Sequence, residues 1–268
     1  MIVDAFIFCK EVDLLEGRFE YLYNHVDYFM VLEADCKFNG EPRELVFPKN
    51  VARYRKYQDK IIYIPYSLDT TTYNFNVNIN QFDGDISHWK AEARMREEGF
   101  GRMLRLLDNK ATVILSDVDE FPNRDLIKPI ERHLTNKVPR IMLQQKTFYG
   151  NFDKVQVHPE LATIVTTAKH LRENGVWKSR NSRGITPVYP DAGWHLSCWY
   201  TAEEVRDKIM TFSHQEFNKE QYTDVDNIIS NIKNKGDYLG REYNPFVPFD
   251  VSTLPKEFYD IFSKYIKI

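Results

Sequence analysis

Residues Val113–Pro122 read VILSDVDEFP, and this stretch sets the architecture of the chain. Its first half is an apolar, β-branched run of the kind that forms a buried strand in a parallel sheet. Its second half places three acidic residues, Asp117, Asp119 and Glu120, within four positions. Because side chains alternate along extended backbone, Asp117 and Asp119 point to the same side. The stretch therefore predicts a buried strand that delivers paired carboxylates to the edge of a sheet.

Upstream of this stretch, apolar strand-like runs alternate with helical patterns. The expected strands are Ile2–Phe8, Tyr28–Glu33 and Ile61–Pro65. One helix is expected to begin at Asp13, with Glu16 in capping-box position, and another to cover Trp89–Leu107. Strands that alternate with helices predict an α/β fold with a mostly parallel central sheet. Such sheets bind their ligands at the carboxyl ends of the strands.

The second half of the chain lacks any linker or internal repeat. Asn123 and Thr201 are expected to cap helices, and Pro255–Ile266 is expected to form a terminal helix. We therefore expect a single domain over residues 1–268. Within it, residues 1–122, which end in the acidic stretch, would form one half, and residues 123–268, with the C-terminal helices, the other.

Composition excludes several classes of protein. The chain of 268 residues has 36 Lys and Arg against 39 Asp and Glu, which is not the balance of a broadly basic nucleic-acid binder. Its three cysteines, Cys9, Cys36 and Cys198, have no metal-ligand spacing and favour a reducing compartment. We find neither a signal peptide nor a transmembrane run, so we expect a cytoplasmic protein. The oligomeric state stays open.

The paired carboxylates of Asp117 and Asp119 allow two interpretations. They would repel each other unless a cation lay between them, and Mn²⁺ or Mg²⁺ could bridge them to a diphosphate. Alternatively, the stretch is an ordinary acidic turn before a helix, where Asp and Asn are favoured without any ligand.

A second segment, Asp191–Tyr200 (DAGWHLSCWY), contains a histidine between aromatic residues. Beside an acidic metal site, His195 is a natural third protein ligand, although a lone histidine is more often a hydrogen-bonded core residue. Gly193 and Ser197 suggest that the segment is a loop, where binding residues concentrate.

A third segment places Trp89, Glu92 and Arg96 on one face of the predicted helix. The planar guanidinium of Arg96 suits phosphate oxygens. The simpler alternative is a surface ion pair between Glu92 and Arg96, four residues apart.

Taken together, these segments resemble glycosyltransferase family 17. The similarity spans roughly residues 4–220 and rests on several motifs in the same order as in the family: EVDLLEGR at 11–18, FNGEPR at 38–43, Trp89 with Glu92 and Arg96, SDVDE at 116–120 followed by Pro122, AGWHLS at 192–197, Lys208, and SHQE at 213–216. Leu196 stands where the animal members have cysteine, and we expect no membrane anchor or stem such as theirs. A soluble bacterial- or viral-type member is therefore the closer picture.

The resemblance implies a GT-A-like fold, a UDP-sugar donor, a Mn²⁺ or Mg²⁺ ion, and inversion at the anomeric carbon during transfer to a glycan hydroxyl. UDP-GlcNAc is the implied donor. By the same resemblance, residues 1–122 would be the nucleotide-sugar-binding half, and residues 123–268 the acceptor-binding half. The implied metal ligands are Asp117, Asp119 and His195. The implied donor contacts are Glu11, Glu33, Arg96, Asp117 and Trp194. The candidates for the base that deprotonates the acceptor are Glu120, Asp191 and Glu216.

Three alternatives remain at this point. The donor could carry another sugar. The chain could be a metal-dependent phosphohydrolase or nucleotidyltransferase, although the block from Gly193 to Ser197 has no role in either. It could also be a nucleotide-sugar-binding module without activity. Acceptor specificity is expected in loops at residues 66–88 and 144–190, and aromatic residues there and nearby could stack on sugars: Tyr149, Trp177, Trp194 and Trp199.

Overall fold

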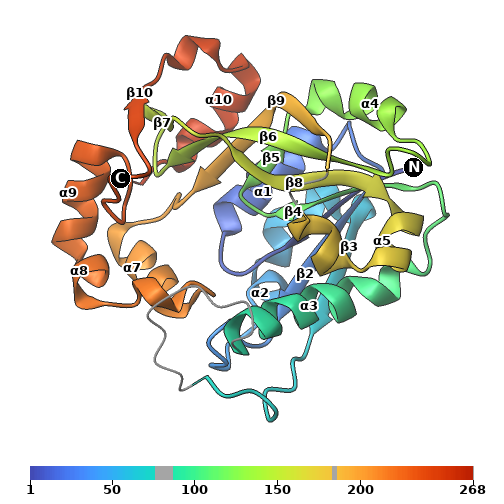
Figure 1. Cartoon of the computed structure of the whole chain (residues 1–268), viewed down its shortest axis with the longest axis horizontal. Coiled ribbons are helices and arrows are strands. Elements are labelled where there is room, and N and C mark those ends of the chain that lie inside the picture. Colours follow the sequence, from blue (N-terminus) through green and yellow to red (C-terminus); the bar gives the residue numbers. More distant parts are fainter. Residues whose placement is uncertain (76–86, 183–185, 268) are drawn as a thin grey trace.

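A computed structural model describes residues 1–75, 87–182 and 186–267 of the chain. An eight-stranded sheet runs through its centre, with helices packed against it (Figure 1). The strand order is β3–β2–β1–β4–β8–β6–β9–β5. The strands are β1 (Ile2–Ile7), β2 (Tyr28–Ala34), β3 (Ile61–Tyr66), β4 (Thr112–Asp117), β5 (Glu120–Pro122), β6 (Arg140–Tyr149), β8 (Glu160–Thr167) and β9 (Val188–Ser197).

Most neighbouring strands of this sheet are parallel. β3, β2, β1 and β4 run parallel to one another, as do β6 and β9, whereas β8 is antiparallel to both β4 and β6. The predicted α/β class with a mostly parallel sheet is confirmed. Because β8 is antiparallel to both of its neighbours, β4 and β6 run in the same direction. The strands β4, β6 and β9 therefore all end at the same edge of the sheet as β1 and β2.

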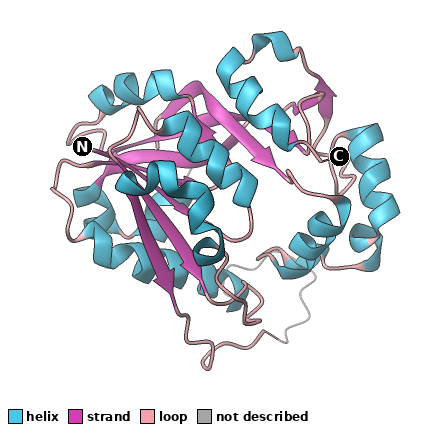
Figure 2. Cartoon of the chain, turned by 180° about the vertical axis from the view of Figure 1, so that it is seen from behind, coloured by secondary structure: helices cyan, strands magenta, loops and turns pink. Residues whose placement is uncertain are grey.

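The helices lie on both sides of the sheet and at one end of it (Figures 1 and 2). They are α1 (Val12–Leu22), α2 (Phe47–Asn50), α3 (Ser87–Leu104), α4 (Arg124–His133), α5 (Ala168–Asn174), α6 (Val176–Asn181), α7 (Ala202–Thr211), α8 (Glu220–Thr223), α9 (Val225–Lys235) and α10 (Lys256–Phe262). A small ribbon of β7 (Lys154–Gln156) and β10 (Phe246–Pro248) lies near α9.

Alternation along β1 shows how the sheet separates two cores. Ile2 and Phe6 belong to the core under α1 and α10, whereas Val3 and Ala5 belong to the core under α3 and α5. Strands buried on both faces need apolar residues at nearly every position. This need explains why the strands were recognisable as continuous apolar runs.

The predicted helix ends are partly correct. The Asn123 side chain caps α4, and Thr201 and Glu204 form a complete capping box at α7, as expected. The capping box expected at Asp13 and Glu16 is wrong, because α1 begins one residue earlier and both carboxylates instead bind Arg53.

Two predicted loops are also wrong. The segment around His195 is the end of strand β9, and its Gly193 serves close packing of strands. A Cβ atom at Gly193 would lie 2.1 Å from the Phe121 carbonyl oxygen on β5. Most of residues 144–190 form strands and short helices. Of the predicted acceptor loop at 66–88, residues 76–86 lie outside the described residues.

Candidate active site

The acidic turn after β4 is held in place by Arg18 of α1. Arg18 Nη1 donates hydrogen bonds to the backbone carbonyls of Asp117, Val118 and Glu120, at 3.1, 3.2 and 2.6 Å. Each of these hydrogen bonds gives a carbonyl of the turn a partner, and a buried carbonyl without one would cost about 1–3 kcal/mol. Arg18 therefore fixes the backbone from which the acidic side chains project.

The other nitrogens of the Arg18 guanidinium bind side chains of strands β1 and β4. Nε and Nη2 donate to the two carboxylate oxygens of Asp4 at 2.7 and 2.6 Å, and Nη2 also donates to Ser116 Oγ. Arg18 and Asp4 are both fully buried. A buried ion pair needs further hydrogen bonds to offset its desolvation, and here the turn supplies them.

Asp117 lies between two arginines. One carboxylate oxygen is 2.5 Å from Arg96 Nη2, and the other is 2.9 Å from Arg180 Nη2. Burial by itself raises the pKa of Asp117, but the positive charges of Arg180 and Arg96 outweigh it and lower that pKa. Asp117 is therefore ionised and bound to protein cations on both sides.

Glu120, a candidate base, is buried in the same network. Its oxygens accept hydrogen bonds from Arg180 at 2.7 and 2.9 Å, from Thr163 at 2.9 Å, and from the Asp117 amide at 3.1 Å. A carboxylate with these partners has little capacity left to take a proton from an acceptor. The arrangement fits a residue that positions Asp117 and Arg180.

Asp119 faces His195 across the junction of β5 and β9, where Glu120 pairs with His195 in register. Asp119 Oδ2 lies 3.5 Å from His195 Nε2 and 3.6 Å from Lys208 Nζ. Burial opposes charge on His195, but the nearby Asp119 carboxylate outweighs it and raises the pKa of His195 to about 9. Burial likewise opposes the charge of Asp119, and His195 and Lys208 overcome it and lower the pKa of Asp119.

Asp119 and His195 are side chains of the kinds that bind divalent cations. Among the described residues, no three or more His, Cys, Asp or Glu side chains are arranged to hold a metal ion. Asp119 and His195 supply a carboxylate and an imidazole, and His195 Nδ1 is buried without a hydrogen-bond partner in the described part of the chain. Mg²⁺ is commonly held by one or two carboxylates together with substrate phosphates. The pair fits a cation that arrives with a diphosphate, whereas Asp117 is occupied by arginines.

Helix α3 brings its predicted face to the site. Arg96 is buried, and it binds Glu92 at 3.0 Å as well as Asp117. Glu92 also accepts a hydrogen bond from Ser213 Oγ at 2.6 Å. The three residues Trp89, Glu92 and Arg96 do share one face, and that face connects the acidic turn with the segment after α7. Arg96 Nη1 is buried and has no hydrogen-bond partner among the described residues.

Glu216, another candidate base, lies on this segment. One of its oxygens is 2.7 Å from His214 Nδ1, and the other, Oε2, is buried without a partner in the described residues. The His214 ring packs edge-on against Trp89 at 4.8 Å, and Trp89 packs against Trp177 at 6.2 Å. Glu216 thus lies beside aromatic side chains and bears one oxygen that no cation of the described residues holds.

Glu11 and Glu33, predicted to contact the donor, are both occupied by the protein. Glu11, after β1, accepts hydrogen bonds from the amides of Cys9 and Lys10 and from the Tyr200 hydroxyl at 2.5 Å. The Glu33 carboxylate accepts four, from Arg43, Tyr63 and the amides of Val46 and Phe47. Both carboxylates anchor loops at the edge of the sheet where the strands end.

The side chains of Asp191 and Trp194 have partners outside the acidic turn. The Asp191 side chain is 76% exposed and pairs with Lys146 at 2.6 Å. It precedes His195 by four residues on the same strand, which corresponds to roughly 13 Å. Trp194 is buried in the core against Phe258, with ring centroids 4.2 Å apart. Neither placement supports the predicted base or donor contact.

Three cations of the site had no predicted role: Arg18, Arg180 and Lys208. Arg18 and Lys208 belong to the motifs shared with the family, so the sequence could have indicated that they matter for the site. Arg180 lies on α6 in a segment without any recognised motif, and only the fold brings it to β4. A positive partner was nevertheless foreseeable, because three neighbouring carboxylates repel one another unless a cation lies among them.

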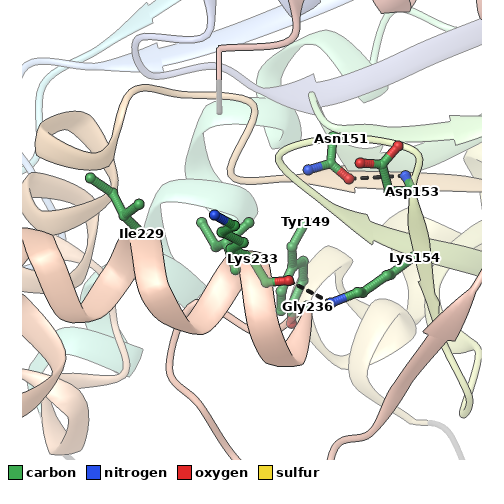
Figure 3. A pocket seen from close by; sticks show the side chains of 8 residues that line it. Tyr149, Asn151, Asp153, Lys154, Ile229, Lys233 and Gly236 are labelled. Atoms are coloured by element: carbon green, nitrogen blue, oxygen red, sulfur yellow. Dashed lines mark hydrogen bonds between the residues drawn. The ribbon is translucent and has the colours of Figure 1, made fainter.

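A cavity of about 320 Å³ lies elsewhere, between the end of β6 and α9 (Figure 3). Its lining includes Tyr149, Asp153, Lys154 and Lys233, and Lys154 Nζ donates to the carbonyl of Lys233. Of the residues predicted for the site, only the aromatic Tyr149 borders this cavity.

The comparison with known proteins gives the family. The sequence model of glycosyltransferase family 17 matches residues 1–244, and the chain belongs to this family. The predicted family is confirmed. Curated relatives include the β-1,4-mannosyl-glycoprotein 4-β-N-acetylglucosaminyltransferases of Rattus norvegicus and Homo sapiens, each 26% identical over 95% of this chain. The match covers 52% of each relative, so the chain spans about half the length of these proteins.

Solved structures with a similar arrangement include the galactosyltransferase LgtC in complex with donor and acceptor sugar analogues. It is 11% identical, with a TM-score of 0.35, over 65% of this chain and 60% of that one. The bifunctional IspDF of Campylobacter jejuni is 10% identical, with a TM-score of 0.37, over 79% and 53%. Likeness of this extent says nothing about activity. Among the described residues, no helix is long and apolar enough to cross a membrane.

Proposed function

We propose that the chain is a metal-dependent, inverting glycosyltransferase that moves GlcNAc from UDP-GlcNAc to a hydroxyl of a glycan. Family membership and the names of the relatives support the class of reaction and the sugar. The observation that carries the proposal is the Asp119–His195 pair, 3.5 Å apart at the edge where the parallel strands end. Ligands of open α/β sheets bind at this edge.

The donor would lie along this edge with its diphosphate over the acidic turn. Arg96 supports this placement, because its Nη1 is buried and without a partner among the described residues, and a phosphate oxygen is a fitting acceptor. Glu33 and Glu11 would shape the uridine side through the loops that they anchor. Asp117 would act through Arg96, which it holds in position.

A divalent cation would be held by Asp119, His195 and the donor phosphates. When bound, Mn²⁺ or Mg²⁺ would neutralise the charge that develops on the departing UDP. The protein's own contribution is to hold Asp119 and His195 at fixed positions, through the β5–β9 pairing and the Arg18 contacts.

Glu216 is the base that the geometry favours among the three candidates. Glu120 is engaged by Arg180, and Asp191 is exposed and distant, whereas Glu216 Oε2 is held by no described cation. In a single displacement, the acceptor oxygen forms a bond to the anomeric carbon while the bond from that carbon to UDP breaks. The hydroxyl proton goes to Glu216, and inversion results because attack and departure occur on opposite faces.

The test is turnover of purified protein with a panel of UDP-sugars, a glycan array and Mn²⁺. We expect UDP release and labelled glycans with UDP-GlcNAc, and loss of both on chelation. Asp119→Ala should lower kcat by about 10²-fold or more, a scale typical of losing one stabiliser of transition-state charge. Asp207→Ala, at an exposed carboxylate of α7, is the matched control.

Each alternative has a distinct result in this assay. Release of phosphate without any sugar acceptor, or formation of a nucleotide polymer, would identify a phosphohydrolase or nucleotidyltransferase. Tight UDP binding without turnover would identify a binding module. Turnover with a different UDP-sugar would identify a glycosyltransferase with another donor sugar.

A further inference from the structure

Lys208 of α7 is the one lysine that contacts the acidic turn among the ion pairs of the described residues. Its Nζ lies 3.6 Å from Asp119 Oδ2, and its side chain is 24% exposed. It also lies over the Tyr200 ring, 5.5 Å from the ring centroid. The Lys208 side chain is therefore partly exposed to solvent where it contacts Asp119, and its ammonium lies over an aromatic ring.

The charges of the acidic turn are already balanced by the protein. Asp117, Asp119 and Glu120 contribute three negative charges, and three Lys and Arg side chains pair with them: Arg96, Arg180 and Lys208. His195 also faces Asp119, and Glu92 adds a further carboxylate beside Arg96. A divalent cation that entered alone would add two positive charges to a balanced group. A cation that enters with a diphosphate adds no net charge.

The three cations are not equally fixed. Arg96 and Arg180 are almost fully buried, and their contacts with Asp117 and Glu120 are between 2.5 and 2.9 Å. Lys208 is the most exposed of the three and has the longest contact. A lysine ammonium on a flexible stem can change partners, whereas a buried two-sided arginine contact cannot do so without large cost. Of the three cations, Lys208 is therefore the one that can leave its carboxylate partner, Asp119.

We propose that Lys208 binds the donor diphosphate, and that it compensates Asp119 only until the donor arrives with its metal. Lys208 Nζ then moves from Asp119 to a phosphate oxygen, and Asp119 becomes available to the metal. This inference rests on the proposed function. Its consequence is an order of binding: the free protein binds the metal weakly, and the nucleotide and metal bind together tightly.

Lys208→Met tests this directly, because it should change two affinities in opposite directions. Binding of Mn²⁺ alone would be measured by the electron paramagnetic resonance of free Mn²⁺, and binding of UDP with Mn²⁺ by calorimetry. Without the competing ammonium, we expect Mn²⁺ alone to bind about five- to tenfold more tightly. Without the phosphate ligand, UDP with Mn²⁺ should bind about tenfold or more weakly, the scale of one charge-assisted hydrogen bond. Lys256→Met removes an exposed, ion-paired lysine of α10 and should change neither.

Three further results would overturn the inference. If Lys208→Met weakens both affinities, Lys208 merely maintains the site. If it strengthens Mn²⁺ binding and leaves UDP binding unchanged, Lys208 is no phosphate ligand. Lys208→Arg keeps the charge and should retain UDP affinity within about threefold, and loss there in a folded protein also counts against the role. Wild-type protein that binds no Mn²⁺ even with UDP contradicts the proposed metal dependence itself, which is a separate failure.

Discussion

Arg18 and Asp4 form an ion pair in which neither side chain reaches solvent, with 2.6 Å between Arg18 Nη2 and Asp4 Oδ1. The pair connects helix α1 to strand β1, and through Arg18 Nη1 it also connects both to the carbonyls of the acidic turn. One guanidinium thereby donates hydrogen bonds both to strand β1 and to the turn that carries Asp119. Stability of the fold and geometry of the site depend on the same side chain.

We predict that Arg18→Met destabilises the protein by about 3–5 kcal/mol, because it leaves Asp4 as an unpaired buried charge. Urea denaturation of the metal-free protein measures this. The matched control is Arg53→Met, since Arg53 is also ion-paired, with Asp13 and Glu16, but at the surface. Its loss should cost no more than about 1 kcal/mol. Equal losses in the two variants would show that burial of the Arg18 pair is unimportant.

Gly193→Ala should disrupt the junction between β5 and β9. The new methyl carbon would lie 2.1 Å from the Phe121 carbonyl oxygen, and a backbone atom cannot easily move aside. Because Glu120 and His195 pair across this junction, we expect loss of both stability and UDP–Mn²⁺ affinity. The melting temperature and a UDP titration test this.

Gly101→Ala is the control for that variant. A Cβ atom at Gly101 of α3 meets nothing within 4 Å, and alanine is favoured over glycine in helices by about 1 kcal/mol. Gly101→Ala should therefore raise the melting temperature slightly and leave UDP affinity unchanged. A stable Gly193→Ala protein with normal affinity would contradict the close-packing argument.

His195 should make the stability of the metal-free protein depend on pH. Its pKa is about 9 in the folded protein, against 6.5 for an ordinary histidine, so folding favours the protonated form. The resulting stabilisation, at most about 3 kcal/mol, is fully present below pH 6.5 and is lost as the pH rises towards 9. Denaturation with chelator at pH 6, 7.5 and 9 measures it. His195→Asn should remove this decline, and parallel curves for the two proteins would contradict it.

Local features of the fold were predictable from sequence, and long-range ones were not. The strand before Asp117 and the caps at Asn123 and Thr201 rest on apolar runs and neighbouring side chains, which a sequence displays directly. The expected loop at His195 was wrong because Gly193 signals close packing of strands as readily as a turn.

Much the same division holds for the candidate site. Asp119 and His195 were predicted as partners through their motifs, and the structure does bring them together. The cations that hold the carboxylates come from α1, α3, α6 and α7, and no spacing along the chain encodes such contacts. Arg180, 60 residues from Glu120 along the chain, is the clearest case.

The last prediction concerns Glu216, whose Oε2 is buried without a partner in the described residues. If it takes the acceptor proton, Glu216→Gln should lower kcat by about 10²–10⁴-fold, the range of general base catalysis. UDP–Mn²⁺ affinity and thermal stability should stay near the wild-type values, because glutamine preserves the shape and its side-chain oxygen can still accept a hydrogen bond from His214 Nδ1. Glu220→Gln, at an exposed glutamate nearby in the chain, serves as control. A large loss in Asp191→Asn together with normal turnover in Glu216→Gln would assign the base to Asp191 instead.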